Sequence, residues 1–212
     1  MLHGKPLIAH TLIQAKASGL FDVIAVSSDS SEILSIAKTW GADLLIERPA
    51  ELASDSAPKM PVVQHCLREA EKLSGLRFDT VVDLDPTSPL RSAGDILESV
   101  SLLEKHHVIN VVTAAPARKS PYFNLVEVDA KNVVTLSKPL PQQVTRRQDA
   151  PKCYDMNASI YVWNRDRLLA CASVFNADTM LYVMPEERSI DIDAEIDFQF
   201  VEFLMQKQGS LA

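Results

Sequence analysis

The first 114 residues alternate segments of helical spacing with short apolar runs of strand character. Helices are expected over residues 6–19, from a capping box at 29–32 to residue 41, and over residues 58–73 and 95–106. Strands are expected over residues 21–26, 43–46, 80–84 and 108–114. This alternation predicts an α/β fold with a mostly parallel sheet and right-handed crossovers. Such sheets bind ligands beyond the carboxyl ends of their strands, here at residues 27–29, 47–49 and 85–88.

The pattern changes between Ala115 and Met156. Five prolines and the pair Arg146-Arg147 interrupt it, while residues 126–128 and 133–136 are spaced to form a hairpin. The segment is too long for a plain connection, so we expect an insertion with its own role. Two interpretations are open: a projecting arm that contacts a second subunit, or a mobile lid. Strands are expected again at 159–163 and 181–184, and residues 1–212 are expected to form one domain.

Composition and charge exclude several classes of protein. The chain has 212 residues, of which 47% are hydrophobic, so it is long enough to bury a sizeable core. Its formal charge of -7 argues against a nucleic-acid surface, which needs a basic field. No apolar run approaches the eighteen or so residues of a membrane span, and no signal peptide precedes the first helix. Three widely separated cysteines fit neither a disulfide framework nor a zinc site, so we expect reduced thiols in a cytoplasmic protein.

Two aspartates near the C-terminus form the most informative local motif, Arg188-Ser189-Ile190-Asp191-Ile192-Asp193. In an extended strand, residues two apart project from one face, with Cα atoms about 6.6 Å apart. Both carboxylates then converge on a hard cation such as Mg²⁺, while Ile190 and Ile192 pack on the other face. The alternative is a half-buried strand with a solvated acidic face. A last helix is expected after Asp193.

Five segments occur in the order in which one enzyme family carries them. They are Arg48-Pro49-Ala50-Glu51-Leu52-Ala53, Asp85-Pro86-Thr87-Ser88-Pro89-Leu90-Arg91, Arg146-Arg147-Gln148-Asp149, Asn157-Ala158-Ser159-Ile160-Tyr161 and the aspartate motif. Together they resemble the acylneuraminate cytidylyltransferases, the CMP-sialic acid synthetase family, which includes the enzymes for legionaminic and pseudaminic acids. No single motif is decisive, but five in order argue against coincidence. The resemblance implies a Rossmann-like, three-layer nucleotidyltransferase of the glycosyltransferase-A type, with a β-rich dimerisation arm over residues 115–156.

The resemblance also implies a reaction. The anomeric hydroxyl of a nine-carbon 2-keto sugar acid attacks the α-phosphorus of CTP, giving a CMP-sugar and pyrophosphate. Asp191 and Asp193 match the family's catalytic, metal-binding aspartates, which hold Mg²⁺ near the phosphates and the reacting hydroxyl. Such chemistry depends on positioning and charge neutralisation, so no separate nucleophilic residue is needed. The rival interpretation is a non-catalytic, dimeric binding or scaffold protein that keeps the fold and the acidic site.

Further residues match substrate-binding positions of that family. Arg48 corresponds to an arginine that contacts the nucleotide, and Arg147 to an arginine on the arm that reaches the sugar acid in the partner's site of a homodimer. Thr87 and Ser88 present hydroxyls and amides at the end of a strand, and Asn157 matches an asparagine at the start of an inner strand. Each of these residues also has a simpler interpretation. In it, Arg48 only caps a loop, Arg147 is only a solvated surface residue, and Asn157 only satisfies backbone groups of a turn.

Three departures from the family pattern bear on activity. Asp85 stands where glutamine is usual, which bears on the sugar substituent that is recognised, and Lys59 stands near a place where serine is common. The family's first strand and its Ala-Arg-x-Gly-Ser-Lys loop, which holds the triphosphate, have no counterpart in the sequence. Two interpretations follow: the chain is truncated, or it descends from the enzyme and no longer does the chemistry. Either predicts a sheet position that is empty or filled by a neighbour, with apolar surface exposed.

Overall fold

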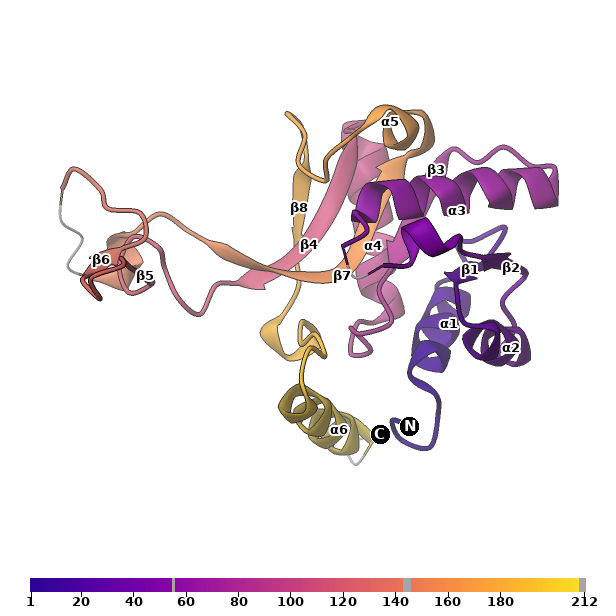
Figure 1. The fold of residues 1–212 in the computed structure, drawn as a ribbon, viewed down its shortest axis with the longest axis horizontal. Coiled ribbons are helices and arrows are strands. Elements are labelled where there is room, and N and C mark those ends of the chain that lie inside the picture. Colours follow the sequence, from indigo (N-terminus) through magenta and orange to yellow (C-terminus); the bar gives the residue numbers. More distant parts are fainter. Residues whose placement is uncertain (55, 143–145, 210–212) are drawn as a thin grey trace.

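The computed structural model describes residues 1–54, 56–142 and 146–209. Its centre is a four-stranded sheet of order β3-β7-β4-β8, formed by Thr80–Leu84, Tyr154–Asn164, Asn110–Pro116 and Met180–Val183 (Figure 1). β7 runs antiparallel to both β3 and β4, whereas β4 and β8 are parallel. Three of the four strands therefore point in one direction, and the reversed strand β7 lies between β3 and β4. Within the described residues, no helix is both long and apolar enough to cross a membrane.

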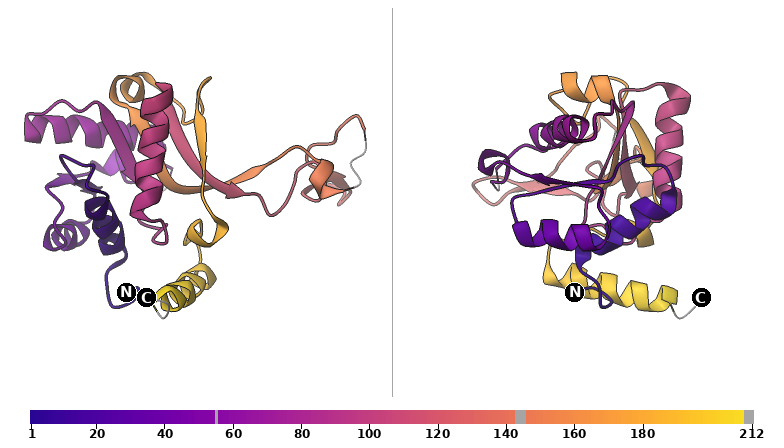
Figure 2. Two further views of the ribbon diagram at one scale, coloured as in Figure 1. Left: turned by 180° about the vertical axis from the view of Figure 1, so that it is seen from behind. Right: turned by 90° about the vertical axis from the view of Figure 1, so that its right-hand side faces the viewer.

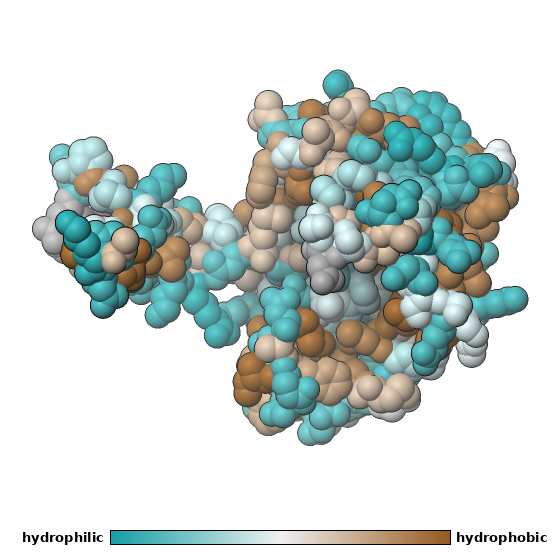
Figure 3. Space-filling model, in the orientation of Figure 1, coloured by the Kyte–Doolittle hydropathy of each residue, from teal (hydrophilic) through white to brown (hydrophobic). Residues whose placement is uncertain are grey.

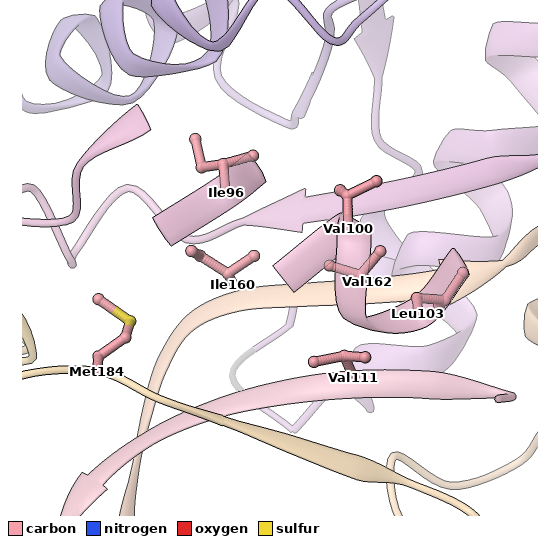
Figure 4. Packing of buried hydrophobic residues seen from close by; sticks show 7 residues of the cluster. All are labelled: Ile96, Val100, Leu103, Val111, Ile160, Val162 and Met184. Atoms are coloured by element: carbon pink, nitrogen blue, oxygen red, sulfur yellow. The ribbon is translucent and has the colours of Figure 1, made fainter. Parts of the chain in front are cut away.

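Helices cover both faces of this sheet. On one face α4 (Ala93–His106) places Ile96, Val100 and Leu103 against Val111 of β4 and Val162 of β7 (Figure 4). On the other face, α3 (Lys59–Ser74) and α5 (Arg165–Ala170) pack over a second cluster of buried residues: Met60, Leu67, Val112, Tyr161, Trp163 and Leu168. Neighbouring strand residues enter opposite clusters because side chains alternate across a sheet. The predicted three-layer α/β architecture is confirmed.

The first two strands form a separate, parallel pair. β1 (Ala25–Ser28) and β2 (Leu44–Glu47) pair with each other and pack against α2 (Ser31–Thr39) and α3, while α1 (Leu7–Ser18) packs against α2 and α4. In the part of the chain that the structure describes, no strand pairs with both β1 and β3. The alternating pattern predicted that the strands of the first 114 residues share one sheet. The structure instead divides them between the β1-β2 pair and the central sheet, because β1 and β3 lack a common neighbour among the described residues. All five residues of β3 are accordingly only partly buried.

Local signals set the helix ends largely as predicted. α1 begins after Pro6 and ends at Gly19, whose φ of 65° is a left-handed conformation that glycine adopts at low cost. α2 begins one residue later than the capping-box spacing suggested, because the Ser30 hydroxyl, and not Asp29, accepts the bond from the Ile33 amide. At α4 a complete capping box joins Ser92 and Asp95.

The predicted insertion projects from the body as an arm. β5 (Val126–Val128) and β6 (Val134–Leu136) form the expected hairpin, which is a sheet of its own far from the helices (Figures 1 and 2). Its stem is longer than predicted, because β7 begins at Tyr154 and continues to pair with the outer half of β4. A register shift in the ladder near Thr113 lets the two strands bend away from the body together. Residues 143–145 of the predicted arm lie outside the described residues.

The last helix, α6 (Glu195–Gly209), lies below the sheet, close to the N-terminus (Figure 1). Its inner side joins a third apolar cluster, in which Val201 packs with Leu2, Leu90, Ile190 and Ile192. Because this cluster contains both isoleucines of the aspartate motif, it helps to set where the two aspartates lie.

Candidate functional site

The loop after β3 is held from beneath by a buried arginine. Arg91 is 2% exposed, and its guanidinium donates to the backbone oxygens of Asp85 and Ser159 and to the Thr11 hydroxyl. Burial lowers the pKa of Arg91 to about 10, since desolvation penalises the charged form. Above it, the Asp85 carboxylate accepts from the Thr87 amide and hydroxyl at 3.3 and 3.0 Å. These bonds orient the loop and leave the second carboxylate oxygen of Asp85 to other partners.

The aspartate motif lies beside this loop, but not as a strand. Glu186–Arg188 is a short 3-10 helix (η3), and residues 189–192 belong to no helix or strand. The predicted strand is therefore wrong, although its alternation of faces holds: Ile190 and Ile192 pack in the core, and the Ile192 amide donates to the Thr87 carbonyl at 3.0 Å. On the opposite side, Asp191 Oδ1 lies 3.4 Å from the Ser88 hydroxyl. The fold thus brings the two motifs together across 103 residues of sequence.

The two aspartates suit a hard divalent cation. Ser88 is the one hydrogen-bond partner of the Asp191 carboxylate among the described residues, and within that part of the chain the Asp193 carboxylate has none. The described residues contain no group of three or more His, Cys, Asp or Glu side chains placed to hold a metal. Two free carboxylates without further protein ligands fit Mg²⁺, which keeps several waters and also takes oxygens from substrate phosphates.

A lysine that the sequence marked only as a departure is part of the same region. Lys59, at the start of α3, lies 2.8 Å from Asp83 and 3.8 Å from Asp85, and its ammonium is 4.3 Å from the centre of the Tyr161 ring. Burial lowers the pKa of Lys59, but the two carboxylates outweigh burial and leave it raised. Sequence reasoning missed the role of Asp83. The available signal was an acidic residue inside the apolar strand Thr80–Leu84.

Arg48 lies at the carboxyl ends of β1 and β2, as predicted. Its guanidinium donates to the Ser27 hydroxyl and carbonyl at 3.2 and 2.7 Å, so it ties the loop after β2 to the end of β1. Arg48 also lines an open cleft of about 610 Å³, whose other lining residues are Asp29, Glu47, Pro49, Ala50, Ala53 and Ser54. The loop-capping role and the predicted nucleotide contact are therefore compatible, and the contact stays a prediction.

The structure assigns Asn157 to the interior of the site. It is 4% exposed; its amide oxygen accepts from the Thr113 hydroxyl at 2.7 Å, and its amide nitrogen donates to the Ser189 hydroxyl at 3.0 Å. Its backbone oxygen accepts from Ser88. Because both ends of the side chain are engaged within the protein, Asn157 joins β4, the loop after β3 and the aspartate motif. The predicted ligand contact stays untested.

Arg147 is not brought to the other predicted residues. It begins the short 3-10 helix Arg147–Asp149 on the arm, and its guanidinium donates to the backbone oxygen of Ala117, at the base of the arm. The neighbouring Arg146 pairs with Asp149 on the surface. Within one copy of the chain, Arg147 therefore has no contact with Asp191, Asp85 or Lys59.

Comparison with known proteins adds independent findings. A family model described as "Cytidylyltransferase" matches residues 1–208. "Post-translational flagellin modification protein B" of Campylobacter coli is 46% identical over 203 residues, which cover 96% of this chain and 85% of that protein. "CMP-N,N'-diacetyllegionaminic acid synthase" of Campylobacter jejuni subsp. jejuni is 46% identical over 199 residues, which cover 94% and 83%.

Solved structures agree on the fold. A CMP:2-keto-3-deoxy-manno-octonic acid synthetase complexed with CTP superposes with a TM-score of 0.66 at 14% identity, covering 98% of this chain and 90% of the other. A 4-diphosphocytidyl-2C-methyl-D-erythritol synthase from Anaerococcus prevotii gives a TM-score of 0.62 at 16% identity, covering 97% and 91%. At these identities, the likeness establishes a shared α/β nucleotidyltransferase fold and nothing finer.

Proposed function

The chain belongs to the cytidylyltransferase family, and from that premise we propose that it transfers CMP from CTP to the anomeric hydroxyl of a sialic-acid-like nonulosonic acid. The observation that carries the proposal is the 46% identity, over 94% of the chain, to an enzyme named for CMP-N,N'-diacetyllegionaminic acid synthesis. That acid is therefore the first substrate to test. A bond forms between the sugar oxygen and the α-phosphorus, the bond to the β-phosphate oxygen breaks, pyrophosphate leaves, and the hydroxyl loses its proton.

The residues around the loop after β3 suit this reaction. Asp191 and Asp193 would hold Mg²⁺, which when bound supplies charge neutralisation at the phosphates and favours ionisation of the attacking hydroxyl. Arg48 and Lys59 supply positive charge at the strand ends, where an anionic nucleotide and sugar acid would lie. The second oxygen of Asp85, which faces Lys59 at 3.8 Å and has Thr87 and Ser88 beside it, is suited to accept hydrogen bonds from sugar hydroxyl or amide groups.

We also propose that the working enzyme is a homodimer joined by the arm. Arg147 has no contact with Asp191 or Asp193 of its own copy, because it binds the backbone at the base of the arm. A guanidinium on a projecting arm can instead reach the sugar acid in a second copy's site. Exposed apolar side chains on the arm are about half accessible and need covering: Leu125, Val126, Val128, Val133 and Val134. These features favour the arm interpretation over a lid.

A second candidate is a binding or scaffold protein without turnover. It would keep the fold and the acidic site, and residues 1–212 contain no Ala-Arg-x-Gly-Ser-Lys loop or other glycine-rich phosphate cradle. Losing even one preorganised donor at a reacting site costs on the order of 10²–10³ in rate. We therefore expect the 212-residue chain alone to bind CTP weakly and to turn it over far more slowly than a version that carries such a loop.

One assay separates these candidates. CMP-sugar formation is measured from CTP, Mg²⁺ and several nonulosonic acids, using the 212-residue chain and the same chain preceded by a strand and loop of roughly 15–25 residues. The transferase proposal expects product from the extended chain, and loss of product in its Asp191→Asn variant. An extended chain that folds and binds CTP but forms no product with any acid supports the scaffold. Robust turnover by the 212-residue chain alone would refute the expectation of weak activity.

The metal site has its own test. Asp191→Asn should weaken Mn²⁺ or Mg²⁺ binding sharply, because it removes one of two anionic ligands, and should barely change the melting temperature without metal. Asp22→Asn is the matched control, since Asp22 is an exposed aspartate on the short turn after α1. If calorimetry finds equal metal affinity in the wild type and in Asp191→Asn, Asp191 is not a metal ligand.

A further inference from the structure

A fully buried carboxylate lies next to the segment that carries the two aspartates. Asp95, in the first turn of α4, is 0% exposed. It accepts from the Ser92 amide and hydroxyl at 2.8 Å each and from the Tyr182 hydroxyl at 3.3 Å. Arg188 completes the set with two parallel bonds of 2.9 Å, from Nε and from Nη2. A buried carboxylate needs such compensation, and here the largest share comes from a residue 93 positions away.

Arg188 is the last residue of η3 and precedes Asp191 by three positions. The segment from 189 to 193 has no ladder bonds, so the position of its backbone depends on individual anchors. The anchors include the Arg188 pair with Asp95, the Ser88 hydroxyl bonded to Asp191, the Ser189 hydroxyl bonded to Asn157, the Ile192 amide bonded to Thr87 and the Asp193 amide bonded to the Asp197 carboxylate. The Arg188 anchor is the only one of these five that joins two opposite charges, and its far end, Asp95, is 0% exposed.

The pairing has an electrostatic consequence as well. A guanidinium three residues from Asp191 and five residues from Asp193 would otherwise be within reach of these carboxylates and would compete with a cation. Asp95 holds this guanidinium by two bonds on the α4 side, and no bond joins Arg188 to Asp191 or Asp193 within the described residues. Both carboxylates are therefore left for a ligand from solution.

We propose that the Arg188–Asp95 ion pair is the positioning device of the metal site, which fixes the segment 189–193 so that Asp191 and Asp193 are preorganised for a divalent cation. The inference rests on the proposed function only in taking these two aspartates as the metal ligands. Residues that orient metal ligands in this way typically contribute 10–100-fold, roughly, to metal affinity.

A purely stabilising ion pair would have the same appearance, and the chain offers a matched control for that case. Arg165 pairs with Glu71 through two bonds of 2.9 and 2.7 Å, with the same bidentate geometry and similar partial exposure of the arginine. This pair ties α3 to the start of α5, and neither residue bonds to the aspartate motif. Arg165→Met therefore removes a comparable ion pair, together with the exposed contact of Arg165 with Asp166, without touching the segment 189–193.

The test compares Mn²⁺ binding by the wild type, Arg188→Met, Arg188→Lys, Arg165→Met and Asp191→Asn. Free Mn²⁺ is measured by electron paramagnetic resonance without nucleotide, and unfolding is followed in EDTA. We expect Arg188→Met to weaken Mn²⁺ binding by about 10–100-fold and Arg165→Met to change it less than about twofold, although both lower the melting temperature. Arg188→Lys keeps the charge but loses the second bond, so an intermediate affinity is expected. If Arg188→Met does not fold, the Mn²⁺ affinity of Arg188→Lys is compared with that of the wild type instead.

The outcomes are separable. If Asp191→Asn abolishes Mn²⁺ binding while both Arg188 variants bind like the wild type, the positioning role is overturned and the metal site stands. If Arg165→Met weakens binding as much as Arg188→Met, the effect is general destabilisation and the inference is likewise overturned. If Asp191→Asn binds Mn²⁺ like the wild type, the metal site itself fails, and the positioning role fails with it.

Discussion

Around the candidate site, Arg91 and Asp95 are buried and Lys59 is partly exposed, and each of these three charges is compensated in a different way. Arg91 binds backbone oxygens and a hydroxyl, Asp95 binds an arginine and a capping serine, and Lys59 lies between two carboxylates and an aromatic face. Breaking such an arrangement by removing one partner typically costs about 3–5 kcal/mol, because the other charge is left unpaired. The loop after β3 and the aspartate motif are therefore held by polar contacts at least as much as by apolar packing.

The pH dependence of stability tests the compensation of Asp95. Burial raises the pKa of Asp95, but the bonds from Arg188 and Ser92 outweigh burial and leave the pKa below its usual value. A lowered folded-state pKa means that the ionised carboxylate adds stability above the unfolded-state value of about 3.9, and that this stability is lost as the pH falls through the lower, folded-state value. Asp95→Asn should therefore lower the free energy of unfolding at pH 7 and flatten its decline below about pH 4.

Urea titrations of the wild type, Asp95→Asn and the exposed control Asp22→Asn, from pH 7 down to pH 2.5, measure this dependence. We expect Asp22→Asn to follow the wild type throughout. Parallel acid declines in the wild type and Asp95→Asn would show that Asp95 binds a proton equally well in the folded and unfolded chain.

At the scale of the elements, α6 and the arm are each apolar on a side that the body does not cover. α6 buries Val201 but exposes Ile196, Phe200 and Phe203, which recur at helical spacing along its outer side. The arm exposes apolar side chains along its hairpin, and in Figure 3 hydrophobic surface appears both on the arm and over α6. Exposed apolar surface of this extent is typical of an interaction site.

Deletion of residues 126–136 tests the role of the arm. The hairpin forms a sheet of its own and contributes nothing to the central clusters, so the body should fold with a nearly unchanged melting temperature. Because the deletion removes most of the exposed apolar side chains of the arm, sedimentation velocity should show monomers. A deletion variant that still sediments as a dimer would contradict the proposal that the arm joins the subunits.

For the whole molecule, charge is divided unevenly between the arm and the body. Residues 115–156 carry seven Lys or Arg and four Asp or Glu, whereas the rest of the chain carries 14 and 24. The arm is thus +3 and the remainder -10, which makes the arm of one copy complementary to the acidic body of another. An arm that reaches a partner's site would also bring positive charge to a pair of anionic substrates.

Salt should therefore weaken the proposed dimer. Raising NaCl from 0.1 M to 1 M shortens the Debye length from about 10 Å to about 3 Å, which screens attraction between arm and body. Sedimentation equilibrium should give a larger dissociation constant at 1 M, with sodium sulfate at equal ionic strength as a check on ion-specific effects. A dimer that is equally tight at both salt concentrations would mean that apolar contacts alone hold it.

Much of this architecture follows from sequence because the interactions involved are local. Pro6 and Gly19 bound α1 through their own backbone preferences, and the reversal at residues 129–132 closes the hairpin of the arm because the Asp129 carboxylate accepts from the Lys131 and Val133 amides. Periodicity identified α1, α2, α3, α4, α6 and most strands, since the side chains of each element face one core, but it missed the six-residue α5. The five family segments could be recognised because each is a short contiguous run of residues. Identifying such a run does not require knowing which residues it contacts in the fold.

Contacts between residues that are distant in the sequence could be known only from the folded structure. β7 runs antiparallel between β3 and β4, and the first two strands form their own sheet, because pairing depends on which neighbours are present. The aspartate motif alternates like a strand, yet it has no partner to make it one. Its place is set by Arg188 reaching Asp95 across 93 residues and by Ile192 reaching Thr87. A sequence pattern records the preferences of a segment, whereas a buried charge and its partner meet only when the whole chain has folded.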